Sequence, residues 1–221
     1  MSKRIILASA SPRRAQILKM HGIAAEIIPA DVDEALPADT NPRIACMYNA
    51  LKKALYVEEM LTEGSVADEH AKADAVIIAA DTIVYNGNIL GKPADDEDAF
   101  RMLSELRGCT HYVMTGTAVV AAGQKDKRVF CEITSVSFGD YSDDEIRSYI
   151  ATGEPADKAG SYAIQGQWSS HITATEGDYF NVIGLPWERL RCELVSLGVD
   201  VHDASQNIPE KKNDFKKIQQ L

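Results

Sequence analysis

The stretch AVIIAAD, residues 75–81, limits the possible folds more than any other part of the sequence. Six apolar residues follow one another and end at a single aspartate. A run this short, bounded by polar residues, predicts a strand. The next segment, TIVYNGNIL, carries Asn86-Gly87 between two apolar runs, and that pair is typical of a tight hairpin turn. The chain is therefore expected to contain a sheet with an internal hairpin.

Helical patterns alternate with the apolar runs. RIILAS (4–9) predicts a strand. Ser11 is a good N-cap and Pro12 a good first helical residue, so we expect a helix from Pro12 to about Met20, with Gly22 as its stop. The alternation begins at the first residues of the chain and continues through most of its length.

A second helix is expected after Asn41-Pro42, which repeats the same start. Apolar residues follow it at helical spacing, namely Ile44, Tyr48, Leu51 and Leu55. We further expect strands at 25–30, 112–122 and 128–138, helices at 95–108, 142–153 and 186–198, and extended or turned chain at 171–184. The fold class is therefore α/β, with a mixed sheet because of the internal hairpin.

The polar segments set the domain boundaries. Residues 62–74 look like a solvated connection or an insertion, and residues 201–221 form a polar tail with few apolar anchors, which we expect to be mobile. We expect a single domain of two lobes over residues 1–200. The composition of the whole chain, 45% hydrophobic and 25% charged, is that of an ordinary globular protein.

Cysteine usage and charge exclude several classes of protein. The four cysteines lie far apart without a CxxC pair, which favours reduced thiols in a cytoplasmic protein. No apolar run approaches the roughly 18 residues of a membrane span. A net charge of 23 − 33 = −10 disfavours binding to nucleic acid polymers. A small anion remains possible, because one lysine about 4 Å from a phosphate contributes ~4 kcal/mol at an effective dielectric of 20.

Familiar nucleotide-binding and hydrolase motifs are missing. GNILGKP resembles a phosphate-binding P-loop, but its spacing is one residue short, and Pro93 stands where Ser or Thr would bind magnesium. The sequence has no Gly-x-Gly, no HExxH and no GxSxG. Candidate sites must therefore come from short polar clusters at the ends of the predicted elements.

The first cluster is SASPRR, residues 9–14, at a predicted strand-to-helix turn. A helix N-terminus offers unpaired N–H groups, and Arg13 and Arg14 add bidentate donors, so the turn suits a phosphate. The alternative is a capped helix with two solvated arginines, and the residues alone do not decide between them.

The second cluster follows the second strand. Asp31, Asp33 and Glu34 form an acidic surface loop or supply a carboxylate that holds magnesium. Lys52 and Lys53 come late in the second helix, where lysines usually face solvent.

Asp81 is the residue that indicates a functional site most clearly. It ends the apolar strand, and in open α/β sheets ligands gather at strand ends. A carboxylate there is costly unless it is exposed, hydrogen-bonded or bound to a metal, which favours function over structure. Lys92 follows the hairpin and is expected to face the same cleft.

The loop DKAGSYAIQG, residues 157–166, contains Lys158, Tyr162 and Gln165 among small residues. It is either a surface loop with an aromatic anchor or a pocket for a base. The amide of Gln165 donates and accepts at once, so it suits the edge of a base.

The clusters together resemble a known family. The stretches LASASPRR, VDE, KKA, AADTIV, GKP, RGCTHYVMTG, KAGSYAIQG and GDYFNVIGLP, in this order, resemble the Maf family of nucleoside triphosphate pyrophosphatases over about residues 4–198. The resemblance implies an elongated, inosine-triphosphatase-like α/β fold of two lobes around a central cleft, often as a homodimer. It departs from the family at Lys52, where an acidic residue is expected, and in the long 62–74 connection.

The resemblance also implies an activity. The family cleaves the α–β phosphoanhydride of a nucleotide, which gives the monophosphate and pyrophosphate, with a divalent metal such as Mg²⁺ or Mn²⁺. Ser9 and Arg14 would hold the triphosphate, Lys53 and Lys92 would neutralise it, Glu34 and Asp81 would bind the metal, and Asp81 would also act as the base toward water.

Base choice is implied by further matches. Arg13, Thr82 and Gln165 match family positions linked to the base, and AADT and AIQG resemble the branch that acts on dTTP and UTP. Two alternatives stay open, namely an enzyme for 7-methyl-GTP or other modified nucleotides, and a nucleotide-binding regulator of septum formation with little turnover. The presence of both Glu34 and Asp81 argues against the regulator, because a pure binder needs no base.

Overall fold

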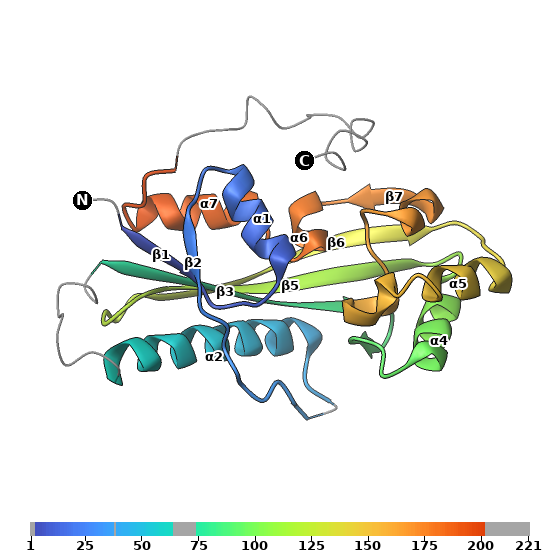
Figure 1. Cartoon of the computed structure of the whole chain (residues 1–221), viewed down its shortest axis with the longest axis horizontal. Coiled ribbons are helices and arrows are strands. Elements are labelled where there is room, and N and C mark those ends of the chain that lie inside the picture. Colours follow the sequence, from blue (N-terminus) through green and yellow to red (C-terminus); the bar gives the residue numbers. More distant parts are fainter. Residues whose placement is uncertain (1–2, 38, 64–73, 202–221) are drawn as a thin grey trace.

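The computed structural model describes residues 3–37, 39–63 and 74–201. These residues form an elongated seven-stranded sheet with helices on both faces (Figure 1). The expected tail, from residue 202 onward, and most of the 62–74 connection lie outside the described residues. None of the helices in the described part of the chain is both long enough and apolar enough to cross a membrane.

The sheet is mixed, as the hairpin predicted. Its strands are β1 (Arg4–Leu7), β2 (Ala25–Ile27), β3 (Ala75–Tyr85), β4 (Ile89–Leu90), β5 (Thr110–Ala121), β6 (Lys127–Phe138) and β7 (Ile172–Glu176). The order is β2-β1-β3-β5-β6-β7, with β4 paired to β3. β1 runs parallel to β2 and β3, and every other pairing is antiparallel.

The helices divide between the faces of the sheet. They are α1 (Pro12–Met20), α2 (Pro42–Glu63), α4 (Asp96–Leu106), α5 (Asp143–Ile150), α6 (Tyr179–Ile183) and α7 (Trp187–Ser196), with short 3-10 helices η1 (Glu154–Asp157), η2 (Ala159–Ser161) and η3 (Gln167–His171). In Figure 1, α2 lies along one face, α1 and α7 lie on the other, and α4 and α5 cover the far end of the long strands.

Local signals set several helix ends. α1 has the predicted bounds, although the side chain of Ser11 makes no capping bond. The capping box of Ser142 and Glu145 is formed at the start of α5. Segment 171–184 was expected to be extended or turned, and it contains a strand followed by α6. That helix begins because the Asp178 carboxylate accepts hydrogen bonds from two backbone N–H groups of its first turn.

β3 is buried on both faces because successive side chains alternate. Val76 and Ile78 pack into the cluster formed with α1 and α7, while Ile77 and Ala79 pack against α2. All four cysteines are free, and the Sγ atoms of Cys46 and Cys131 lie 3.7 Å apart.

Most of the apolar stripe that predicted α2 faces away from the sheet. Ile44, Tyr48 and Leu55 are exposed. Leu51 is partly buried against the core cluster under the helix, in which Ala54 is fully buried. The periodicity therefore identified the helix but not its buried face.

A buried histidine on β5 makes stability depend on pH. His111 is fully buried, and its Nε2 atom lies 2.7 Å from the hydroxyl of Tyr162. Burial lowers the pKa of His111 from 6.5 to about 4. The unfolded chain therefore binds more protons between these two values, so His111 makes the protein lose stability as pH falls through that window.

We expect His111→Gln to flatten this dependence, because glutamine keeps a hydrogen-bonding partner for Tyr162 but does not titrate. The wild type should lose about 2 kcal/mol more unfolding free energy than the variant between pH 7 and pH 5, at 1.36 kcal/mol per pKa unit. Urea unfolding at the two pH values measures the difference. Equal losses in both proteins would contradict the expectation.

Candidate active site

A cleft of about 1220 Å³ opens beside β3. Its walls include all ten residues predicted from the sequence, namely Ser9, Arg13, Arg14, Glu34, Lys53, Asp81, Thr82, Lys92, Lys158 and Gln165. They come from the β1–α1 turn, the loop before α2, α2 itself, β3, the segment after β4 and the loop between η1 and η3. The fold thus brings together segments that lie up to about 150 residues apart.

Asp81 lies inside β3, and the expectation that it ends a strand is wrong. β3 continues to Tyr85 because β5 pairs with it from Val76 onward. On its other edge β3 pairs with β1 only as far as Ile78, and with β4 only from Val84. In the described residues the edge between these pairings has no ladder partner. This gap gives Asp81 access to the cleft.

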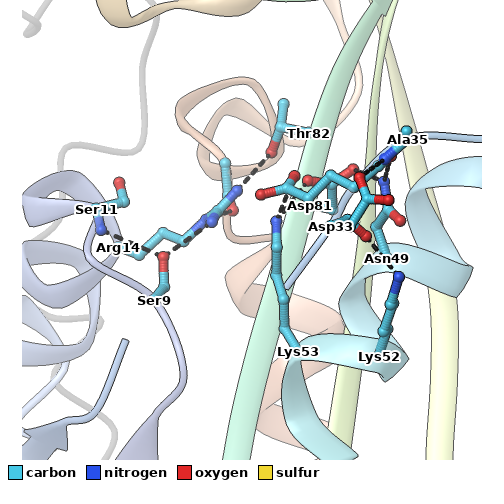
Figure 2. A network of polar contacts seen from close by, with 12 residues as sticks. Ser9, Ser11, Arg14, Asp33, Ala35, Asn49, Lys52, Lys53, Asp81 and Thr82 are labelled. Carbon is cyan, nitrogen blue, oxygen red and sulfur yellow. Dashed lines mark hydrogen bonds and ion pairs between the residues drawn. The ribbon is translucent and has the colours of Figure 1, made fainter. Parts of the chain in front are cut away.

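Arg14 joins three segments of the chain at the cleft. Its Nη1 donates to Ser9 Oγ at 3.0 Å, and its Nη2 donates to Thr82 Oγ1 at 3.1 Å (Figure 2). Its Nε donates to the carbonyl oxygen of Gly184 at 2.8 Å. Burial lowers the pKa of Arg14 although Asp81 opposes the change, and the guanidinium stays charged. The alternative of a solvated arginine is therefore wrong for Arg14.

Gly184 was missed by the sequence reasoning as a site residue. It ends α6 with a φ of 117°, a conformation that side chains rarely adopt. An added Cβ would lie 3.2 Å from Thr82 Oγ1 and 3.5 Å from Arg14 Nε. The only signal was its place in the family-like stretch GDYFNVIGLP.

Lys53 bridges the two predicted metal-binding carboxylates. Its Nζ lies 2.8 Å from Glu34 Oε2 and 2.8 Å from Asp81 Oδ1. Lys53 and Asp81 are each 8% exposed, so Lys53 does not face solvent as helix lysines usually do. Burial alone would raise the pKa of Asp81, but the charge and hydrogen bond of Lys53, with the charge of Arg14, hold it below its ordinary value. Asp81 is therefore ionised at neutral pH.

The other acids and Lys52 hold the loop in place. Asp33 Oδ1 accepts from the backbone N–H of Ala35, and Lys52 Nζ donates to the carbonyl oxygen of Asp33. Neither Asp31 nor Asp33 lines the cleft. Glu34 is the one residue of this acidic loop that reaches both the cleft and Lys53.

Asn49 was also missed. It lies one helical turn before Lys53, so both side chains project from the same face of α2. Its Nδ2 donates to the carbonyl oxygen of Glu34 at 3.2 Å and approaches Asp81 Oδ2 at 3.5 Å. The four-residue spacing from Lys53 was the signal that could have identified it.

An ion pair joins Arg13 after β1 to Asp157 of η1, and both residues line the cleft. Asp157 Oδ2 lies 3.1 Å from Arg13 Nη1, and Asp157 Oδ1 lies 2.6 Å from Lys158 Nζ. Lys158 Nζ also donates to the carbonyl oxygen of Glu154. Arg13 and Lys158, which were both predicted to bind the substrate, are thus paired with the same carboxylate.

The loop at residues 157–166 has the predicted aromatic anchor. Tyr162 is buried, and the contact of its hydroxyl with His111 anchors the loop. Gln165 lies at the cleft wall next to Tyr179, whose pKa is raised by burial, and a hydrogen bond with Gln165 partly offsets the rise. Lys92 also lines the cleft, and no ion pair joins it to another residue within the described ranges.

The donor set fits a hard divalent cation. Glu34 and Asp81 supply oxygens, and Asn49 Oδ1 is a buried acceptor that lacks a hydrogen-bonding partner in the described part of the chain. The described residues contain no group of three or more His, Cys, Asp or Glu side chains placed to hold a metal ion, so the two carboxylates would need other ligands beside them. Mg²⁺ matches such a site, because it commonly binds one or two carboxylates and keeps waters or substrate phosphates as its other ligands.

Comparisons with known proteins show which family and which curated proteins this chain is similar to. The family model described as Maf-like protein matches residues 4–197. A dTTP/UTP pyrophosphatase of Bacillus cereus (strain ATCC 10987 / NRS 248) is 44% identical over 204 residues, which cover 91% of this chain and 94% of that protein. A dTTP/UTP pyrophosphatase of Bacillus anthracis is 43% identical over 204 residues, which cover 91% of this chain and 100% of that protein.

Proposed function

Since this chain belongs to the Maf-like protein family, we propose that it hydrolyses nucleoside triphosphates, preferably dTTP and UTP, to the monophosphate and pyrophosphate. One observation carries the proposal. The buried Lys53–Asp81 pair and the exposed Glu34 lie in the same cleft as Arg14 and Ser9. Such a site combines cations for a polyphosphate with carboxylates for a metal and a proton.

The triphosphate would occupy the side of the cleft formed by the β1–α1 turn. Arg14 is held there by Ser9, Thr82 and a backbone carbonyl, so its position costs little reorganisation when an anion binds. The first turn of α1 adds unpaired backbone N–H groups. Lys92 would approach the anion from the opposite wall. Phosphoryl transfer depends mainly on such positioning and charge stabilisation.

Glu34 and Asp81 would hold the divalent cation, Mg²⁺ or Mn²⁺. When bound, the cation supplies Lewis acidity at the phosphates and makes a nearby water more acidic. Asp81 is ionised at neutral pH and lies on a rigid strand, so it can accept the proton of the attacking water. Lys53 would neutralise charge on the leaving pyrophosphate while it keeps both carboxylates in place.

The activity is tested by product analysis with a panel of nucleoside triphosphates. The expected products are pyrophosphate and the monophosphate in equal amounts, in the presence of Mg²⁺ or Mn²⁺, with dTTP and UTP as the fastest substrates. Release of single phosphates would overturn the proposal. Tight binding without products would support a regulator instead.

Base choice is the next prediction, and it concerns Gln165. Uracil and thymine present an acceptor at O4 beside a donor at N3, and one amide can match both. Cytosine reverses this edge, and buried polar groups left unpaired cost about 1–3 kcal/mol each. We therefore expect a preference for dTTP and UTP over CTP of roughly tenfold or more in kcat/KM, since about 1.4 kcal/mol is a factor of ten.

Gln165→Ala should reduce this preference more than it reduces the best rate, because the side chain would touch the base and not the phosphates. Steady-state kinetics with dTTP, UTP and CTP give the ratio. A variant that discriminates against CTP as well as the wild type does would show that backbone groups read the base edge.

The proposal includes a homodimer. The apolar side chains that α2 exposes, Ile44, Tyr48 and Leu55, support it, because they offer a surface for a second copy of the chain.

A further inference from the structure

Asn49 is a buried polar residue to which the proposed reaction assigns no role. It is 6% exposed and lines the cleft beside both predicted metal-binding carboxylates. Lys53 contacts Oδ1 of Asp81, and Asn49 approaches the other oxygen of the same carboxylate (Figure 2). The two side chains of α2 therefore hold Asp81 from both of its oxygens.

The neighbours of the amide fix its orientation. Nδ2 faces the carbonyl oxygen of Glu34 at 3.2 Å and Oδ2 of Asp81 at 3.5 Å, and both are acceptors. The flipped amide would place its own oxygen against these two oxygens, which is unfavourable. Oδ1 must therefore point the other way.

Oδ1 is buried there without a hydrogen-bonding partner among the described residues. Buried acceptors are rarely left unpaired in proteins, so each one requires an explanation. A water bound to a cation can only donate, and a neutral acceptor satisfies it without adding a third negative charge. Mg²⁺ keeps several such waters when it binds through one or two carboxylates.

We propose that Asn49 is a positioning residue for the metal centre, and this rests on the proposed function. Its Nδ2 fixes the side chain of Asp81 relative to the backbone of Glu34. Its Oδ1 accepts a hydrogen bond from a water in the shell of the divalent cation. Outer partners of this kind commonly change metal affinity or activity 10–100-fold when they are replaced.

The test measures Mn²⁺ binding by electron paramagnetic resonance, with the metal alone and with a non-hydrolysable α,β-methylene analogue of dTTP. Asn49→Ala should weaken Mn²⁺ binding about tenfold or more. Asn49→Asp should keep or tighten Mn²⁺ binding, because it retains the acceptor and adds charge. The same variant should melt at a lower temperature in EDTA, because its second oxygen faces Asp81.

Asn88→Ala serves as the matched control. Asn88 is an exposed asparagine of the same cleft, on the turn between β3 and β4. Its replacement should leave Mn²⁺ affinity unchanged. A purely structural role for Asn49 predicts instead that metal affinity falls in both Asn49 variants in proportion to their loss of melting temperature.

Wild-type Mn²⁺ affinity in Asn49→Ala, or equal losses in the Ala and Asp variants, would overturn the proposal, as would a wild type that binds no Mn²⁺. These measurements need no turnover. If the wild type releases no pyrophosphate but Asn49→Ala still loses Mn²⁺ affinity, the proposed function fails while the assignment of Asn49 stands.

Discussion

Replacing Asp81 with asparagine should lower the rate of pyrophosphate release by about 10²–10⁴-fold, the usual range for the loss of general base catalysis. Loss of a metal-binding oxygen would add to this effect. Asp81 is ionised at neutral pH because Lys53 and Arg14 outweigh the effect of burial, so the change removes a full negative charge and, in the proposed mechanism, the proton acceptor. Steady-state assays with dTTP and Mg²⁺ measure the loss.

The Asp81→Asn protein should stay folded and still bind nucleotide, because Lys53 keeps its contact with Glu34 and Arg14 keeps its hydrogen bond to Ser9. Asp31→Asn is the matched control, since Asp31 lies in the loop before α2 but does not line the cleft. A rate above a tenth of the wild-type value would remove Asp81 from the role of base.

Gly116→Ala is expected to have the largest effect on stability. Gly116 lies on β5 opposite Asp81, where α2 crosses the sheet. An added Cβ would come within 2.4 Å of backbone atoms of α2, namely the carbonyl group of Cys46 and the N atom of Met47. These atoms cannot move unless the helix moves. Overpacking typically costs about 1–3 kcal/mol and at times more, and we expect at least about 3 kcal/mol here.

Urea unfolding measures this loss, which corresponds to a fall in Tm of about 6 °C or more for a domain of this size. Activity should fall as well, because α2 carries Lys53 and Asn49. Gly91→Ala is the control, since an added Cβ there meets no atom within 4 Å. Equal unfolding midpoints for the Gly116 variant and the wild type would show that α2 can move away from the sheet at little cost.

The two predictions concern one feature of the fold. The close approach of α2 to β5 places Lys53 beside Asp81, which burial would otherwise make difficult to ionise. A larger residue at position 116 would move the helix and separate the charge pair. The Lys53–Asp81 pair therefore depends on the absence of a side chain at Gly116.

Where the sequence predicted structure well, the signal was local. Pro12 located the start of α1 because its fixed φ suits the first helical position. Ser142 with Glu145 located the start of α5 because a capping box acts within a single turn. The cluster of apolar residues at 75–80 gave β3, and Asn86-Gly87 gave the turn after it. The ten candidate site residues also lie in one cleft, as the family resemblance implied, although their roles stay predictions.

Only the tertiary structure decided how these parts meet. The position of Asp81 inside a strand follows from its pairing with β5, more than 30 residues away in the sequence, and the opening beside it follows from the early end of β1. Gly184 reaches Arg14 across 170 residues, and Asn49 becomes significant only beside Asp81. The sequence alone determined the strands, the helix starts and the residue types of the site, since these depend on neighbours along the chain. Packing between distant segments decided which face of α2 is buried and which charges are paired, since burial and distance depend on the whole fold.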